Sequence, residues 1–150
     1  MTYAGDLTPS EAWDLLKDDE RAVLVDVRTE GEWRGVGVPD TTALNKDPHF
    51  IEWVHADGRP NPGFLTALAE AGLAPGDGRP VVFLCRSGVR SIAAAHAATA
   101  AGFGPAYNVL EGFEGGVDAS GQRGSTGWKA RGNAWTRTTE TTRTTETTQA

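Results

Sequence analysis

Two short runs of apolar residues constrain the fold of this chain more than any other feature. The first is Ala22–Val27, in which Asp26 is the only polar residue, and the second is Val81–Leu84. Continuous runs of this kind, rich in β-branched residues, are typical of strands that are buried on both faces. The sequence therefore predicts two strands in the interior of a sheet.

Three helix starts lie before and between these strands. Thr8-Pro9-Ser10-Glu11 places a Thr cap, a proline at the first helical position and a glutamate three residues after the cap, which is the signature of a capping box. Thr29-Glu30-Gly31-Glu32 repeats the capping pattern and predicts a brief helical turn. Asn61-Pro62 predicts a further helix that begins at a cap plus proline and ends near Gly72.

The second strand leads into another helix. Residues Ser91–Ala101 are rich in alanine and are followed by Gly102, and Ala106–Leu110 is a final strand candidate. Residues 34–61 match no regular pattern. Because strands alternate with helices, the chain is predicted to be an α/β domain with a mainly parallel sheet.

The chain is long enough for one domain and a short tail. Its 150 residues suit a single hydrophobic core, and Trp128 and Trp135 are expected to tie the last segment back onto the domain. From Thr136 onward nine of fifteen residues are threonine. We therefore predict a single domain over residues 1–135 and a disordered Thr-rich tail over residues 136–150.

Composition and charge exclude several classes of function. The formal net charge is −6 and no extended basic stripe is present, so a nucleic acid is not an expected partner. A single cysteine allows no internal disulfide and no multi-cysteine zinc site, and neither a metal nor a cofactor is expected. No apolar stretch is long enough to span a membrane, and residues 1–6 lack a signal-peptide pattern. The protein is therefore expected to be cytoplasmic, where a thiol stays reduced.

The single cysteine, Cys85, lies between a predicted buried strand and a helix N-terminus. Parallel-sheet proteins bind ligands at this place in the fold, where loop amides and the helix dipole attract an anion. Arg86 and Arg90 add positive charge, and Gly88 allows the loop to curl around one atom. Together these features favour the thiolate, which is the form that attacks sulfur or phosphorus.

The alternative for Cys85 is a buried structural residue at the end of a strand. Free cysteines are often small core residues, and for an arbitrary cysteine this is the more common case. Two nearby arginines, a turn that contains glycine and a following helix reverse the preference here. A reactive thiol is therefore the favoured interpretation.

Three segments of the sequence carry a resemblance to a known family. They are Cys85-Arg86-Ser87-Gly88-Val89-Arg90-Ser91, the upstream Val25-Asp26-Val27-Arg28 with Glu32-Trp33, and the later Asn108-Val109-Leu110-Glu111-Gly112-Phe113-Glu114-Gly115. These segments resemble hallmark stretches of the rhodanese-like domain family, and the likeness covers roughly residues 7–135.

The resemblance implies both a fold and an activity. The fold is a three-layer α/β/α domain with a central, mainly parallel five-stranded sheet. The activity is that of a single-domain sulfurtransferase of the thiosulfate type. In this reaction Cys85 takes a sulfane sulfur from a small anionic donor such as thiosulfate, holds it as a persulfide and passes it to cyanide or a thiol.

The length of the loop after Cys85 distinguishes between two chemistries. Four residues separate Cys85 from Arg90, whereas the related phosphatases and arsenate reductases have five, which make a wider cradle for a tetrahedral oxyanion. The shorter loop favours sulfur transfer, so a phosphatase or arsenate reductase is the weaker alternative. A second alternative is a sulfur-relay or protein-interaction module that passes persulfide sulfur to a partner protein. Such a module needs the same Cys85, so the sequence leaves it open.

Roles are proposed for each residue of the loop. Cys85 is the expected nucleophile and sulfur carrier. Arg86 and Arg90 are expected to attract the anionic donor, while the resemblance implies instead that the Arg90 side chain turns away and braces the loop. The other members of the loop are expected to contribute mainly backbone amides, and they are Ser87, Gly88, Val89 and Ser91.

Asp26, Arg28 and Glu32 are expected to support the site. Asp26 and Arg28 form either a charged pocket or a structural ion-pair network, and the structural role is favoured because charged residues beside a cap mostly make local bonds. Arg28 and Glu32 are expected to pair across the short helical turn.

Overall fold

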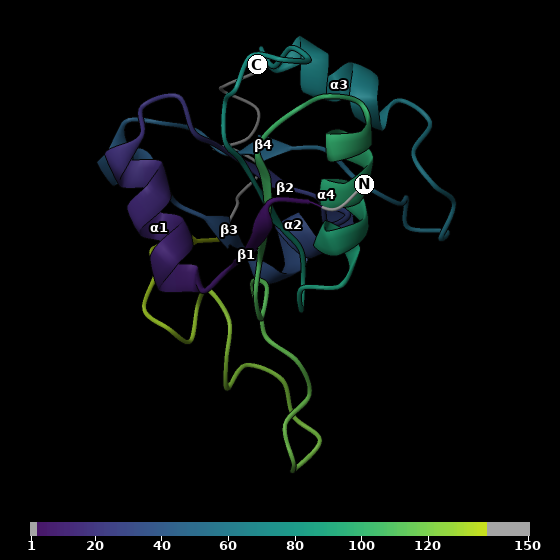
Figure 1. Ribbon diagram of the computed structural model, residues 1–150. Helices are drawn as coiled ribbons and strands as arrows, with labels where there is room; N and C mark the ends of the chain where they lie inside the picture. The colour runs from purple at the N-terminus through teal and green to yellow at the C-terminus, as the bar shows by residue number, and fades with distance from the viewer. Residues whose placement is uncertain (1–2, 138–150) are drawn as a thin grey trace.

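A five-stranded parallel sheet forms the centre of the computed structural model, which describes residues 3–137 (Figure 1). The strand order is β1-β6-β5-β2-β4, and every neighbouring pair in this sheet is parallel. The predicted α/β fold with a mainly parallel five-stranded sheet is therefore confirmed. The strands are β1 (Gly5–Leu7), β2 (Val23–Asp26), β4 (His49–Phe50), β5 (Val81–Leu84) and β6 (Ala106–Val109).

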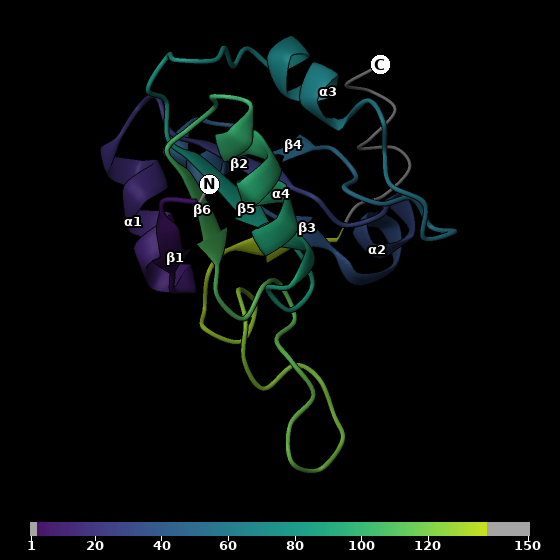
Figure 2. The same ribbon diagram turned by 45° about the vertical axis from the view of Figure 1, so that its right-hand side comes forward.

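Helices cover both faces of the sheet. Figures 1 and 2 place α1 on one side of the sheet and α3 and α4 on the other, which makes three layers. The helices are α1 (Pro9–Asp18), α2 (Glu30–Val36), α3 (Phe64–Glu70) and α4 (Arg90–Ala100).

The two central strands divide the core between these layers. Successive side chains of a strand point to opposite faces, so Val81 and Phe83 pack with α3 and α4, while Val82 and Leu84 pack with α1. All four residues of β5 and all four of β2 are buried. The apolar runs in the sequence therefore form the interior strands that they predicted.

The capping motifs begin two of the helices as expected. The Thr8 hydroxyl accepts from the Glu11 amide at 3.1 Å, and the Glu11 carboxylate accepts from the Thr8 amide at 2.9 Å. The same reciprocal pair begins α2 at Thr29.

The predicted start of α3 at Asn61-Pro62 is two residues early. The Asn61 side chain accepts from the Gly63 amide at 2.9 Å and thereby closes a separate turn. The helix itself begins at Phe64, with Gly63 as its cap.

The stretch over residues 34–61 carries short pieces of regular structure. It contains β3 (Val38–Pro39), a single 3₁₀ turn (Thr42–Leu44) and the edge strand β4. Lys46 fixes this stretch to the end of α1, because its ammonium group donates to three backbone carbonyls. These are Leu16 at 2.7 Å, Asp19 at 2.9 Å and Ala22 at 2.8 Å.

The chain after β6 leaves the sheet as a projecting loop and then returns (Figure 1). Trp128 is completely buried against the α1 layer, and its indole donates to the Ala134 carbonyl at 2.8 Å. Trp135 and Thr136 form β7, which pairs antiparallel with β3. The expectation that Trp128 and Trp135 hold this segment on the domain is confirmed.

The predicted boundary between domain and tail, after residue 135, falls within β7. Thr136, which the sequence assigned to the tail, belongs to β7. Residues 138–150, on which the prediction of a disordered tail mainly depends, lie outside the described residues. Within residues 3–137, no helix is both long enough and apolar enough to cross a membrane.

Candidate functional site

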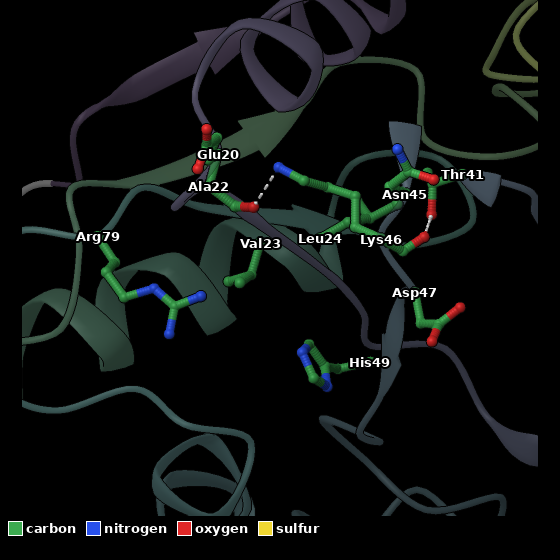
Figure 3. A pocket seen from close by; sticks show the side chains of 10 residues that line it. All are labelled: Glu20, Ala22, Val23, Leu24, Thr41, Asn45, Lys46, Asp47, His49 and Arg79. Atoms are coloured by element: carbon green, nitrogen blue, oxygen red, sulfur yellow. Dashed lines mark hydrogen bonds between the residues drawn. The ribbon is translucent and has the colours of Figure 1, made fainter. Parts of the chain in front are cut away.

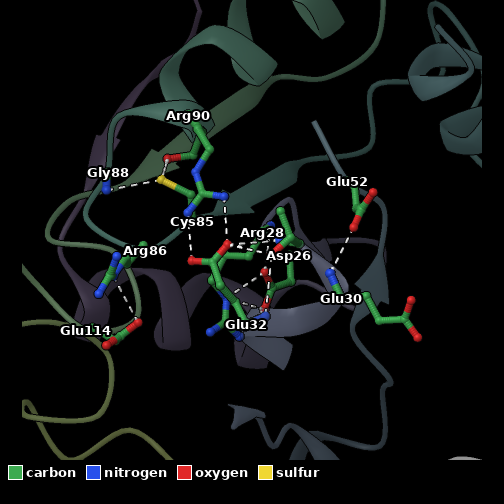
Figure 4. A network of polar contacts seen from close by, with 12 residues as sticks. Asp26, Arg28, Glu30, Glu32, Glu52, Cys85, Arg86, Gly88, Arg90 and Glu114 are labelled. Atoms are coloured by element: carbon green, nitrogen blue, oxygen red, sulfur yellow. Dashed lines mark hydrogen bonds and ion pairs between the residues drawn. The ribbon is translucent and has the colours of Figure 1, made fainter. Parts of the chain in front are cut away.

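Cys85 follows the central strand β5 directly and lies at the base of the loop that leads into α4 (Figure 4). The residue is only 1% exposed. Parallel strands all point the same way, so the carboxyl ends of β5 and β2 bring Cys85 close to Asp26 and Arg28. The sulfur therefore lies where a parallel sheet presents its reactive groups.

Two groups contact the sulfur. The Gly88 amide donates to Cys85 Sγ at 3.1 Å, and the Ser91 hydroxyl lies 3.1 Å from the same atom. Gly88 has φ +100, and a Cβ at this position would lie 3.3 Å from the Glu111 nitrogen. The loop can therefore curl around the sulfur only because residue 88 is a glycine.

Ser91 contributes more than sequence reasoning assigned to it. Its hydroxyl lies beside the sulfur and also donates to Asn108 Oδ1, whereas the sequence predicted mainly a backbone amide. Asn108 is itself buried and was not singled out as a site residue. One signal was available, since Asn108 is a polar residue within the otherwise apolar strand β6.

Arg90 points across the loop to Glu32 of α2. Its two terminal nitrogens donate to the two carboxylate oxygens of Glu32, each at 2.8 Å. The expected pair between Arg28 and Glu32 is therefore wrong, because Glu32 binds a residue 58 positions away.

The pKa values of this pair follow from the geometry. Burial alone would raise the pKa of Glu32, but the hydrogen bonds from Arg90 and Thr29 outweigh it and lower the pKa from 4.5 to about 2. The pKa of Arg90 is raised, chiefly by its hydrogen bond to Glu32. Both groups are thus charged over the whole physiological range.

Asp26 and Arg28 form a second pair, which is fully buried. Arg28 Nη2 lies 2.6 Å from Asp26 Oδ2 and also donates to the Gly37 carbonyl at 2.9 Å. The guanidinium carbon lies 4.2 Å from the centre of the Phe113 ring. This geometry matches the structural ion-pair network that the sequence favoured, since the two opposite charges pair with each other inside the protein. Arg28 Nη1 is buried without a hydrogen-bond partner among the described residues.

The segment after β6 is bonded to the loop that contains Cys85. The Phe113 amide donates to the Cys85 carbonyl at 2.8 Å, and the Glu114 amide donates to the Arg86 carbonyl at 3.0 Å. The Arg86 side chain forms an ion pair with Glu114 at 3.3 Å. Gly112, with φ +64, allows this approach, because a Cβ there would lie 2.6 Å from the Cys85 carbonyl oxygen.

A cavity of about 280 Å³ lies at the amino-terminal ends of the strands, opposite the end at which Cys85 lies (Figure 3). Lys46, His49 and Arg79 line it, together with Val23 at the beginning of β2. The pKa of His49 is lowered, first by burial and then by the Arg79 charge. Because Val23 begins a strand and Cys85 follows the end of one, this cavity is separate from the site around the sulfur.

Residues 3–137 contain no group of three or more histidine, cysteine, aspartate or glutamate side chains that could hold an ion.

A family model described as the rhodanese-like domain matches residues 8–119. The chain belongs to the rhodanese-like domain family. The match includes Cys85, its loop and the segment that binds the loop carbonyls.

The names of the bacterial relatives of this rhodanese-like domain state no activity. An uncharacterized protein of Rickettsia rickettsii is 36% identical over 127 residues, which cover 84% of this chain and 92% of that protein. An uncharacterized protein of Rickettsia prowazekii is 32% identical over 126 residues, with the same coverage of both chains.

Solved structures share the fold. The crystal structure of Rv0390 from M. tuberculosis is 55% identical, has a TM-score of 0.84 and covers 91% of this chain and 100% of its own. A polysulfide-sulfur transferase homodimer from Wolinella succinogenes is 27% identical, with a TM-score of 0.53, and covers 71% of this chain and 68% of its own. A rhodanese-like domain protein from Staphylococcus aureus, 21% identical with a TM-score of 0.52 over 75% of this chain and 87% of its own, agrees in fold alone.

Proposed function

We propose that this rhodanese-like domain is a sulfurtransferase that carries sulfur on Cys85. The observation that carries the proposal is the position of the sulfur at the base of a tight loop, with the Gly88 amide 3.1 Å from Sγ. An amide that donates to this point stabilises negative charge on sulfur as the reaction proceeds. The cysteine also needs to be reduced, which fits a cytoplasmic protein.

The proposed reaction consists of two successive nucleophilic displacements at sulfur. The Cys85 thiolate attacks the outer sulfur of thiosulfate, so that an S–S bond forms at Sγ while the bond to the sulfonate breaks and sulfite leaves. A thiolate or cyanide then attacks the outer sulfur of the persulfide, and the Cys85 thiolate is the leaving group. Nucleophilic catalysis of this kind replaces one difficult transfer with two easier ones.

The position of Arg90 argues against phosphoryl transfer. A phosphatase needs a guanidinium that binds the oxygens of the transferred group. Both terminal nitrogens of Arg90 are instead bonded to Glu32. Together with the loop of four intervening residues, this supports sulfur transfer over the phosphatase or arsenate reductase alternative.

A protein partner is the second candidate for the sulfur donor or acceptor. Both arginines of the loop are paired with carboxylates, Arg86 with Glu114 and Arg90 with Glu32. A dianion such as thiosulfate therefore has to compete with a carboxylate for Arg86. Val89 is 71% exposed in the same loop, so the loop is accessible to a partner protein.

Mass spectrometry of the intact protein tests the proposal. Incubation with thiosulfate should add one sulfur atom to the wild type and none to Cys85→Ser, and the added sulfur should be lost when cyanide or a small thiol is supplied. Retained turnover by Cys85→Ser would overturn the mechanism. An adduct that forms only with a persulfidated protein would favour the relay, and phosphate release from an aryl phosphate would favour the phosphatase.

A further inference from the structure

Three polar side chains form a continuous chain of hydrogen bonds behind the sulfur. Ser91 Oγ lies 3.1 Å from Cys85 Sγ and donates to Asn108 Oδ1. Asn108 Nδ2 donates to Asp6 Oδ1 at 3.0 Å. These hydrogen bonds therefore run from the sulfur, through α4 and β6, to the edge strand β1, where no functional residue was predicted from the sequence.

Asp6 determines the orientation of the Asn108 amide. An ionised carboxylate only accepts hydrogen bonds, and Asp6 Oδ1 also accepts from the Tyr3 hydroxyl at 2.7 Å. Asn108 must therefore turn its NH₂ group toward Asp6, because its carbonyl oxygen would be repelled there. The carbonyl oxygen is left facing Ser91.

The orientation of Asn108 in turn determines the direction of the Ser91 hydroxyl. A hydroxyl has one proton and two lone pairs, and Ser91 directs its proton to Asn108 Oδ1. A lone pair of Ser91 Oγ is then the group that faces Cys85 Sγ. Ser91 is completely buried, so no solvent competes for its proton.

We propose that Asp6 and Asn108 are positioning residues that make Ser91 a hydrogen-bond acceptor toward Cys85. An acceptor stabilises the S–H form and opposes the thiolate, whereas the Gly88 amide favours the thiolate. Ser91 therefore acts on the sulfur in the opposite sense to Gly88. The inference rests on the proposed function only in taking Cys85 as the reacting group.

This arrangement suits a cysteine that carries sulfur. The thiolate is the form that oxidants attack most readily, so an acceptor at Ser91, which stabilises the S–H form, slows oxidation of the unloaded sulfur. Once loaded, Sγ is bonded to a second sulfur and carries no proton, and the Ser91 lone pair then faces an uncharged atom.

The pH profile of Cys85 alkylation tests the sign of the effect. Cys85 is the only cysteine, so intact mass reports its reaction with iodoacetamide at each pH. We expect Ser91→Ala to lower the pH of half-maximal rate by about half a unit, since it removes an acceptor from the thiol. Asp6→Ala should lower it by about one unit, because the freed Ser91 hydroxyl can then donate to the thiolate.

Tyr3→Phe is the matched control, since it removes the other hydrogen bond to Asp6 and leaves Asn108 in place. Its midpoint should equal that of the wild type. If a substitution only made Cys85 easier for iodoacetamide to reach, the maximal alkylation rate at high pH would rise and the pH of half-maximal rate would stay unchanged. Apart from Asp6, whose charge Asp6→Ala removes, the charged groups on the elements around the sulfur stay intact in every variant, and they are Asp26, Arg28, Glu32, Arg86, Arg90 and Glu114.

A midpoint that rises in Ser91→Ala would overturn the proposal, because it would mean that Ser91 donates to the thiolate. An unchanged midpoint in Asp6→Ala would equally show that Asp6 has no role in orienting Ser91. Alkylation needs no sulfur donor, so a failure of this inference is distinguishable from a failure of the proposed sulfur transfer.

Discussion

The guanidinium of Arg90 and the carboxylate of Glu32 bind each other through two hydrogen bonds of 2.8 Å, side by side. The pair joins the first turn of α4 to the third residue of α2. Arg90 was expected either to attract a donor or to brace the loop, and the geometry favours the brace. The Arg90 guanidinium thereby fixes the end of the loop against α2.

Arg90→Lys should destabilise the fold by about 1–2 kcal/mol, since lysine cannot reproduce a two-pronged bond to a carboxylate. Chemical denaturation measures the change. Arg34→Lys is the matched control, because Arg34 pairs with Glu30 on the surface, with side chains 65% and 61% exposed. Its effect should stay within about 0.5 kcal/mol; equal losses in the two variants would contradict the bracing role.

Glu32 should make stability depend on pH at acidic values. Its folded-state pKa is lowered from 4.5 to about 2, so its contribution is complete above about pH 4.5 and is lost as the pH falls through about 2. The difference in unfolding free energy between the wild type and Glu32→Gln should therefore shrink across this window. A difference that stays constant from pH 7 to pH 2.5 would disprove the link.

Glu114→Gln should lower the KM for thiosulfate about two- to fivefold, because it releases Arg86 from its ion pair. Arg86→Ala should raise the same KM. Glu70→Gln, on the exposed surface of α3, changes the net charge equally and should leave the KM unaltered. If Glu70→Gln and Glu114→Gln act alike, the effect is one of overall charge only.

Gly112→Ala should distort the loop that holds Cys85. A Cβ at residue 112 would lie 2.5 Å from the Arg86 carbonyl carbon, and φ is +64. We expect a loss of about 2 kcal/mol or more in stability together with a fall in sulfur uptake measured by intact mass. Gly116→Ala has open space around its Cβ and should be nearly neutral, so a harmless Gly112→Ala would show that the contact with Arg86 is unimportant.

Lys46→Met should cost about 2 kcal/mol, because it deletes three hydrogen bonds from an ammonium group to the carbonyls around the end of α1. Sulfur uptake by Cys85 at saturating donor should be preserved, since Lys46 lies at the amino-terminal end of the strands, away from Cys85. Lys17→Met, on the exposed face of α1, is the control for loss of one charge. A large loss of sulfur uptake in the folded Lys46 variant would contradict this separation.

The interior of the fold was predictable because its signals are local. The apolar runs form β2 and β5, and the capping boxes at Thr8 and Thr29 begin α1 and α2. The edge strands were not predictable. Gly5–Leu7 and His49–Phe50 are three and two residues long, and each pairs with a single neighbour, so strand pairing rather than local propensity determines them.

In the candidate site, too, contacts between residues close in the sequence were predictable and contacts made by the fold were not. Cys85 and Gly88 lie close together in the sequence, and the structure places the amide against the sulfur. The partner of Glu32 was mistaken, because spacing on a helix favoured Arg28 while the fold brings Arg90 within reach. Asn108 reaches Ser91, which contacts the sulfur, from another strand, and no spacing in the sequence predicts that approach.

The carbonyls of Cys85 and Arg86 are already bonded to the amides of Phe113 and Glu114. The backbone of the loop is thus ordered when the chain folds, before any donor is present. A donor that binds to such a preorganised loop loses little affinity to the ordering of flexible protein segments. Its reacting sulfur also meets Sγ in a nearly fixed geometry. The protein therefore meets the entropic cost of sulfur transfer once, during folding, rather than at every turnover.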